Sequence, residues 1–187
     1  MVPLWNPRLP AAIVAATVLS FGALTIATTN YPSSAPPPPA IAASPIGGLK
    51  ASELHDSFNE IHHGHRHEAI DIMKPYGTPI HAVVDGTIQK LFASRAGGTT
   101  IYEFDTNGIY CYYYAHLDRY ADGLHEGMNV ARGQILGYVG SSGDAAADAP
   151  QLHLAILRLR PDKRWWRGTP IDPYPVLLAF LEKPRRE

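Results

Sequence analysis

Two apolar runs meet at a turn signal in TPIHAVVDGTIQKLF, residues 78–92. Asp85-Gly86 stands between them, and this dipeptide between two alternating runs is typical of a two-residue β-hairpin loop. A second pair of runs, 99–104 and 109–115, is separated by DTNG at residues 105–108 and predicts a second hairpin. With further runs at 134–139 and 152–159, the regular spacing of short strands predicts a mostly β, antiparallel domain.

Helical signals are few beside these strands. Residues 176–183 follow Pro175 and predict one helix near the C-terminus, and residues 51–58 give a weaker helical pattern. The chain has 187 residues, which is room for one ordinary domain and a tail. Its 16 basic and 17 acidic residues nearly cancel, so the charge gives no reason to expect nucleic acid as a partner. Cys111 is the only cysteine and excludes an intramolecular disulfide.

The first part of the chain has the composition of an export or anchoring segment. No charged side chain occurs between Arg8 and Lys50, and residues 9–29 are largely apolar, close to the roughly 20 residues that a membrane-spanning helix needs. Residues 1–30 are therefore expected to be a signal peptide or an uncleaved N-terminal membrane anchor. Either places the rest of the chain in the cell envelope, on the periplasmic side, released by cleavage or anchored to the inner membrane.

A linker is expected next. Residues 31–49 are rich in Pro, Ala and Ser and include four consecutive prolines at 36–39. Such a composition favours extended polyproline conformations and buries nothing, so the folded domain is expected to occupy residues 50–187.

Three residues distant in the sequence form a candidate metal site. His67 and Asp71 lie four residues apart, and His153 follows some eighty residues later. Two imidazoles and one carboxylate leave a tetrahedral zinc one ligand short, which is the arrangement of a catalytic zinc with a water in the open position. His116 is the best candidate for a base beside that water.

Strand periodicity allows these groups to share one groove. If residues 66–72 are extended, His67 and Asp71 lie on one face of that strand. On the last strand Gln151 and His153 share a face, and Leu152 and Leu154 lie on the other. Both strands could then present polar groups to a groove and apolar groups to a core.

Each candidate also has a simpler explanation. His67 and Asp71 could be solvated loop residues, and His153 a half-buried structural histidine. The tract HHGHR at residues 62–66 could bind metal adventitiously, although a plain loop is the preferred interpretation. Arg160, Arg164 and Arg167 surround Trp165-Trp166 and could be either a substrate wall or, as preferred here, a packed C-terminal edge.

The order of short motifs is more specific than any one residue. The chain contains RHEAIDI (66–72), GTPI (77–80), DGTI (85–88), YAHL (114–117), GQILG (133–137), GSSG (140–143) and LHL (152–154). This series resembles the lysostaphin-type (LytM) zinc endopeptidases, which cut peptide cross-links in bacterial peptidoglycan. The resemblance covers about residues 58–160 and leaves a C-terminal extension at 161–187.

The resemblance implies a fold and a set of roles. Its fold is an antiparallel β-sheet groove, preceded in this chain by the apolar N-terminal segment and the Pro-rich linker. His67, Asp71 and His153 fall on the family's Zn²⁺ ligands, and His116 falls on a catalytic histidine. The peptide of peptidoglycan is the implied substrate, with envelope proteins as further expected partners.

Two positions depart from the family pattern. Ala69 replaces a glycine, which should only restrict the backbone. Gln151 stands where a second catalytic histidine is expected; its amide can donate a hydrogen bond but cannot exchange a proton near neutral pH. An active metalloendopeptidase is the leading hypothesis. A non-catalytic relative that activates another wall hydrolase and a zinc-binding structural or sensor domain are the alternatives.

Overall fold

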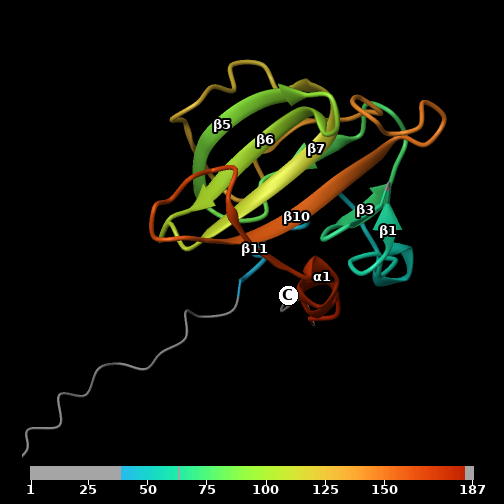
Figure 1. Ribbon diagram of the computed structural model, residues 1–187, viewed down its shortest axis with the longest axis horizontal. Coiled ribbons are helices and arrows are strands. Elements are labelled where there is room, and N and C mark those ends of the chain that lie inside the picture. The colour runs from blue at the N-terminus through green and yellow to red at the C-terminus, as the bar shows by residue number, and fades with distance from the viewer. Residues whose placement is uncertain (1–38, 63, 184–187) are drawn as a thin grey trace, which may run out of the picture. The chain divides into compact units, whose positions relative to one another are not determined.

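A computed structural model describes residues 39–62 and 64–183 (Figure 1). Its strands are β1 (Ile61–His62), β2 (His65–Arg66), β3 (Ile70–Met73), β4 (Pro79–His81), β5 (Gly86–Ser94), β6 (Gly98–Asp105), β7 (Tyr110–Tyr120), β8 (Asn129–Val130), β9 (Ile135–Val139), β10 (Gln151–Leu159) and β11 (Gly168–Ile171). Nine of them form one antiparallel sheet in the order β11-β10-β7-β6-β5-β8, with β3 paired to β10, and β9 paired to both β7 and β4. The prediction of a mostly β, antiparallel domain is therefore confirmed.

Strand β10 is the centre of this arrangement. On one side it pairs with β7, so that His153 lies opposite Ala115 and Leu154 opposite Tyr114. On its other side the first half pairs with β3 and the second half with β11. Strand β10 therefore holds the short strand β3 and the C-terminal strand β11 along the same edge (Figure 1).

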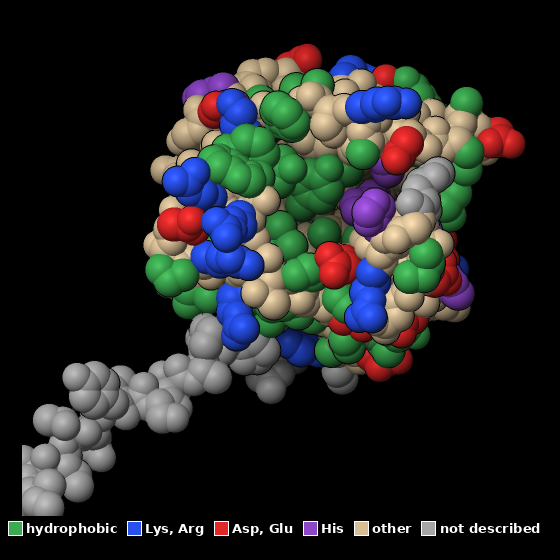
Figure 2. Space-filling model, in the orientation of Figure 1, with side chains coloured by type: hydrophobic (Ala, Val, Ile, Leu, Met, Phe, Trp, Pro, Cys, Tyr) green, Lys and Arg blue, Asp and Glu red, His purple; other side chains and the backbone are tan. Residues whose placement is uncertain are grey.

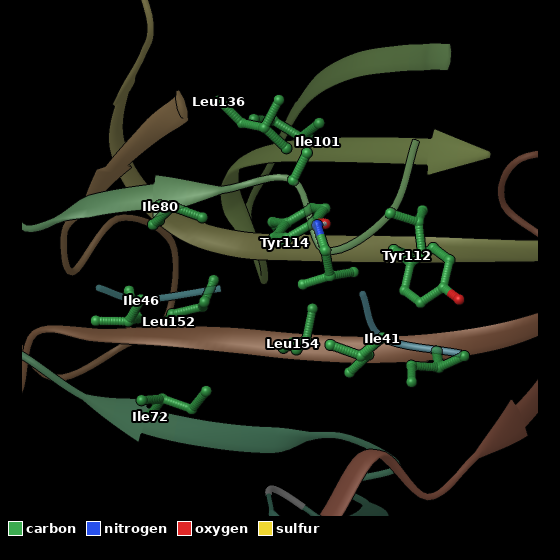
Figure 3. Close-up of a cluster of buried hydrophobic side chains, with 14 of the residues drawn as sticks. Ile41, Ile46, Ile72, Ile80, Ile101, Tyr112, Tyr114, Leu136, Leu152 and Leu154 are labelled. Carbon is green, nitrogen blue, oxygen red and sulfur yellow. Dashed lines mark hydrogen bonds between the residues drawn. The ribbon is translucent and has the colours of Figure 1, made fainter. Parts of the chain in front are cut away.

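One face of the sheet carries the main core. Leu152, Leu154 and Ile156 alternate along β10 and are fully buried, together with Tyr114 of β7 and Ile72 of β3. Figure 3 shows several of these side chains pointing toward one another between the strands. Burying each such side chain stabilises the fold by about 1.5–3 kcal/mol. The period of two in the sequence thus fixes which face of the sheet is the core.

One of the two predicted hairpins forms and the other does not. Residues 105–108 join β6 to β7, which pair antiparallel, as predicted. Asp85-Gly86 does not close a hairpin, because β4 pairs with β9 while β5 pairs with β6 and β8. A type I′ turn needs positive φ at both central residues, and neither is among the described residues with that conformation. Gly86 instead allows close packing, since a Cβ there would lie 2.4 Å from the carbonyl oxygen of Phe104.

The segment before residue 50 contributes to the core, which differs from the expectation for a linker. Ile41, Ile46 and Leu49 are buried in the main cluster. Ile46 forms a β-bridge with Ile80, and the Tyr112 hydroxyl donates to the carbonyl of Ala40. The prediction missed these apolar side chains because they are widely spaced along an extended stretch of Pro-rich composition.

The expected signal or anchor at 1–30 and the linker residues 31–38 lie outside the described residues. Within residues 39–62 and 64–183, no helix is long and apolar enough to cross a membrane.

Helices occupy little of the domain. Helix α1 runs over Pro173–Leu181, so it begins three residues before the predicted start. Asp172 caps it by accepting from the amide of Tyr174, and prolines are tolerated in the first turn because the amides there have no partner within the helix. The weaker helical prediction at 51–58 is reduced to a single 3₁₀ turn, η1 (Ala51–Glu53).

Candidate active site

Two neighbouring strands bring Asp71 and His153 together. They are direct partners in the β3–β10 ladder, and Asp71 Oδ1 lies 3.0 Å from His153 Nδ1. His67 reaches the same point from the turn before β3, where its backbone amide donates to Glu60 and Glu68 adopts a positive φ of 56°. The expected strand at 66–72 therefore begins only at residue 70. A turn, and not the face of one strand, places His67 Nε2 3.1 Å from Asp71 Oδ2.

These three side chains form a compact set of donor atoms. His67 Nε2 also lies 3.1 Å from His153 Nδ1, so each of these nitrogens lies within 3.1 Å of the other and of one Asp71 carboxylate oxygen. Ligand atoms of a tetrahedral zinc with bonds of about 2.0–2.1 Å lie roughly 3.3 Å apart. His67 Nδ1 lies 3.2 Å from the carbonyl oxygen of Ser57, and donating to it leaves Nε2 as the lone-pair nitrogen. The geometry and the donor chemistry fit one zinc ion.

The ionisation of each of these three side chains depends on its neighbours in the set. Burial opposes ionisation of Asp71, yet the hydrogen bonds with His153 and His67 hold its pKa well below the usual range. Burial lowers the pKa of His153. For His67, burial is outweighed by the hydrogen bond with Asp71, and the net effect raises its pKa. Asp71 thus accepts hydrogen bonds as an anion, and a metal ion held by this set would replace the protons that the two imidazoles share with it.

A β-bulge directs His116 into the same site. Tyr112 and Tyr114 face the core, and strict alternation would send His116 to the core as well. Pairing with β6 shifts register here, because Tyr114 pairs with Ile101 but Leu117 pairs with Thr99. The extra residue returns Leu117 to the core, and His116 takes a positive φ of 60°. Such a conformation is unfavourable for a residue other than glycine and is common at functional sites.

The ring of His116 is held in one orientation. Its Nδ1 lies 2.8 Å from the carbonyl oxygen of Ser142, so donation to that oxygen leaves Nε2 with a lone pair. Ser142 is itself fixed, since its hydroxyl donates to Leu117 and accepts from the amide of Thr99. The His116 and His153 ring centroids are 5.6 Å apart. His116 is thus arranged as a proton acceptor beside the three donor residues.

Gln151 shares the site face of β10 with His153. Both line a hollow of about 670 Å³ together with His116, Asp71 and residues 144–146 of the loop that precedes β10. Figure 2 shows histidine side chains at the edge of this hollow. Of the residues singled out from the sequence, the structure therefore gathers His67, Asp71, His116, Gln151 and His153 around one cavity.

Two further residues border the site. The sequence analysis preferred a plain loop for the tract that contains His62, but His62 lies in β1, which pairs with β2, and its ring stacks on His67 with centroids 4.3 Å apart. Ligand-capable atoms of His62, His67 and Asp71 lie within 4.8 Å of one another, so His62 is an additional candidate ligand on the exposed side. Tyr113 meets His153 edge-on at 5.9 Å. The alternation of YCYYYAH (110–116) assigns Tyr113 to the site face, whereas His62 had no sequence signal beyond the histidine tract.

Comparison with known proteins agrees with this geometry. The model of Peptidase family M23 matches residues 65–173, which is more than half of the chain, and the chain belongs to that family. It is 35% identical over 119 residues to the L-Ala–D-Glu endopeptidase of Bacillus subtilis, covering 61% of this chain and 35% of that protein. It is 31% identical over 115 residues to the glycyl-glycine endopeptidase ALE-1 of Staphylococcus capitis, covering 61% of this chain and 30% of that protein. The chain thus spans about a third of the length of these curated relatives.

Solved structures show the same fold. The catalytic domain of lysostaphin from Staphylococcus simulans matches with a TM-score of 0.53 and 30% identity, covering 62% of this chain and 81% of that one. A lytM protein from Ruminococcus gnavus matches with a TM-score of 0.62 and 29% identity, covering 74% and 60%. The lysostaphin-like fold expected from the sequence motifs is confirmed.

Proposed function

We propose that this protein is a zinc-dependent metalloendopeptidase that hydrolyses peptide cross-links of bacterial peptidoglycan. The observation that carries the proposal is the convergence of His67, Asp71 and His153 to within 3.1 Å of one another, with His116 oriented beside them. Members of the M23 family are typically zinc-dependent, and one relative of this chain is named as a peptidoglycan DD-endopeptidase. This membership supports the reaction class and leaves the cleaved bond open.

Each residue of the site has a distinct role in this proposal. His67, Asp71 and His153 would hold the zinc ion, which would supply a Lewis acid for the substrate carbonyl and lower the pKa of a water. His116 accepts the proton of the attacking water at Nε2 and returns it to the leaving amine, because its Nδ1 is committed to Ser142. Gln151 donates its amide N–H to the substrate carbonyl or to the developing oxyanion.

The same proposal places the protein in the cell envelope. An N-terminal segment without charge from residue 9 to residue 49 supports export, with residues 9–29 either cleaved or retained as an inner-membrane anchor. The domain would then meet its substrate on the periplasmic side, where envelope proteins are candidate partners.

Purified peptidoglycan sacculi provide the test. The full chain is incubated with sacculi in the presence of zinc or of a chelator, and released fragments are identified by mass spectrometry. We expect zinc-dependent loss of cross-linked dimers, and the new termini would name the bond. Intact sacculi, from folded protein shown to hold zinc, would contradict the peptidase proposal.

One observation favours a second function. Gln151 occupies a site-facing position where the family pattern has a proton-exchanging histidine. A non-catalytic protein that activates another wall hydrolase would tolerate this glutamine. Under that alternative, sacculi remain intact with this chain alone but are opened faster when a second hydrolase is added.

A further inference from the structure

A row of aromatic rings leads away from the candidate zinc site on the same face of the sheet. The Tyr113 ring, edge-on to His153, lies 4.6 Å from Tyr102, which lies 4.7 Å from Trp165. Trp165 in turn lies 5.0 Å from Trp166 and 5.4 Å from Phe92. These five residues are called the aromatic ledge below. Consecutive ring centroids in it are less than 6 Å apart, so it forms a continuous surface.

The inner part of the ledge is packed and the outer part is open. Trp165 covers a second apolar cluster that includes Cys111 and Leu159, which fixes its position. Trp166 is 54% exposed and Phe92 is 41% exposed. The preferred sequence interpretation, a packed C-terminal edge, therefore describes Trp165 but not Trp166. A large exposed aromatic surface next to a cavity is typical of a binding site.

Polar groups border the exposed rings. The Arg164 guanidinium lies 5.2 Å from the Trp166 ring centroid, and its Nε is 3.3 Å from Asp162 Oδ2. Figure 2 shows Lys and Arg side chains around a hydrophobic patch that borders the hollow. The Arg164–Asp162 pair therefore offers hydrogen-bond donors and an acceptor beside the exposed ring.

From this arrangement we infer that the aromatic ledge binds the N-acetylated amino-sugar strand of peptidoglycan. A pyranose ring has a flat face of C–H groups that fits an exposed indole, and an edge of hydroxyl and acetamido groups that fits Arg164 and Asp162. The inference rests on the proposed function, because it assumes that the hollow takes the peptide of the same polymer.

The distance along the sheet agrees with this ligand. The spacings between successive rings place the Trp166 ring at most about 20 Å from the His153 ring. An extended peptide of about six residues spans that distance. In peptidoglycan a short peptide joins each cross-link to the sugar strand, so a peptide cleaved at His153 would bring its sugar strand to the ledge. An acidic peptide attracted by Arg160 and Arg167 is the competing occupant.

Calorimetric titration of the full chain separates these occupants. One ligand is a peptide-free tetrasaccharide of alternating N-acetylglucosamine and N-acetylmuramic acid, and the other is a sugar-free cross-linked peptide dimer. We expect Trp166→Ala to weaken tetrasaccharide binding about five- to tenfold and Trp166→Phe to restore most of it. Tyr76→Ala is the matched control, since Tyr76 is a similarly exposed ring outside the ledge and should change the affinity less than twofold.

The test also distinguishes this inference from the proposed function. His116→Ala should slow hydrolysis of sacculi about 10²–10⁴-fold without changing tetrasaccharide affinity, because His116 is not part of the ledge. Glycan binding without hydrolysis by the unsubstituted chain would support the ledge and contradict the peptidase. No tetrasaccharide binding by the unsubstituted chain would overturn the inference, as would an equal loss of peptide-dimer binding in Trp166→Ala. Altered self-association in that variant, with unchanged glycan affinity, would assign the ledge to a second copy of the chain and overturn it as well.

Discussion

The two faces of the central sheet differ in what holds their side chains. On β10, Leu152, Leu154 and Ile156 point to the core and have no exposed surface. The alternating residues Gln151 and His153 point to the cavity and are only half-buried. The same strand thus supplies packing on one face and donor atoms on the other. Because the core residues fix the strand, the polar residues between them are held in place.

Strand β7 shows the same division with one modification. Tyr114 belongs to the core and Tyr113 to the site face, as simple alternation requires. His116 reaches the site only because of the bulge before Leu117, and a hydrogen bond with Ser142 then fixes its ring. Substitutions on the core face are therefore expected to lower stability, and substitutions on the site face to lower activity.

His116→Ala should have the largest effect, on the site face alone. Removing a positioned acid/base group typically slows a reaction about 10²–10⁴-fold. We expect that loss in the rate of cross-link cleavage, with a melting temperature close to that of the unsubstituted chain. Relief of the strained φ at residue 116 is not expected, since alanine also disfavours that conformation. A large fall in stability with normal activity would show that the two faces are not separable in this way.

Leu154→Ala should act on the core face. Leu154 is fully buried and lies one residue from His153. Removing a buried leucine side chain costs about 2–5 kcal/mol in free energy of unfolding. Chemical denaturation measures this loss, and Arg158→Ala, an exposed position on the same strand, is the control. A cost below about 1 kcal/mol would contradict the assignment of this face as the main core.

The substitution Glu103→Gln tests the core face in a different way, because Glu103 is a carboxylic acid buried in the core. It has no exposed surface and accepts a hydrogen bond from the Tyr114 hydroxyl at 2.6 Å. Burial raises its pKa from 4.5 to about 8. The folded state therefore binds the proton more tightly than the unfolded state, and this contribution to stability is complete below pH 4.5 and is lost as the pH rises through about 8.

The glutamine variant should remove that pH dependence. Between these pH values the free energy of unfolding of the unsubstituted chain should fall, relative to the variant, by on the order of 5 kcal/mol. Denaturation at several pH values, with Glu182→Gln as an exposed control, measures the difference. Parallel stability curves would contradict a buried, protonated Glu103.

Gln151→His should have the smallest effect, and it tests how completely Gln151 serves in place of a histidine. A second proton-exchanging group on the site face should raise the cleavage rate about tenfold, and the rate should then fall at acid pH as that imidazole is protonated. Hydrolysis of sacculi as a function of pH is the measurement. Activity that appears only in the variant would favour the regulatory function for the natural chain.

Much of the fold followed from local patterns in the sequence. Alternation in LHLAILRL (152–159) identified β10 and its two faces, and the turn residues 105–108 identified a hairpin that forms. The hairpin prediction at Asp85-Gly86 was wrong because a local turn signal does not reveal that β4 pairs with a more distant strand, β9. Burial of Ile41 and Ile46 was missed for a similar reason, since their contacts lie far along the chain.

The site was predicted less completely than the sheet. His153 and Gln151 could be placed on one face by periodicity, but the approach of His67 depends on a turn at Glu68, which has no clear local signal. The orientation of His116 depends on a bulge, which appears only when β6 and β7 are paired. The stacking of His62 on His67 likewise results from the fold around β1 and β2.

Zinc content is the most direct test of the claim that the site face forms a metal centre. The full chain and its Asp71→Ala, His153→Ala and His116→Ala variants are equilibrated with zinc and then freed of excess metal. The bound zinc is measured by elemental mass spectrometry, and circular dichroism checks that each variant is folded. We predict about one zinc per chain for the unsubstituted protein and for His116→Ala, and a loss of at least tenfold in zinc affinity for the other two. Unchanged zinc content in folded Asp71→Ala and His153→Ala would contradict the account.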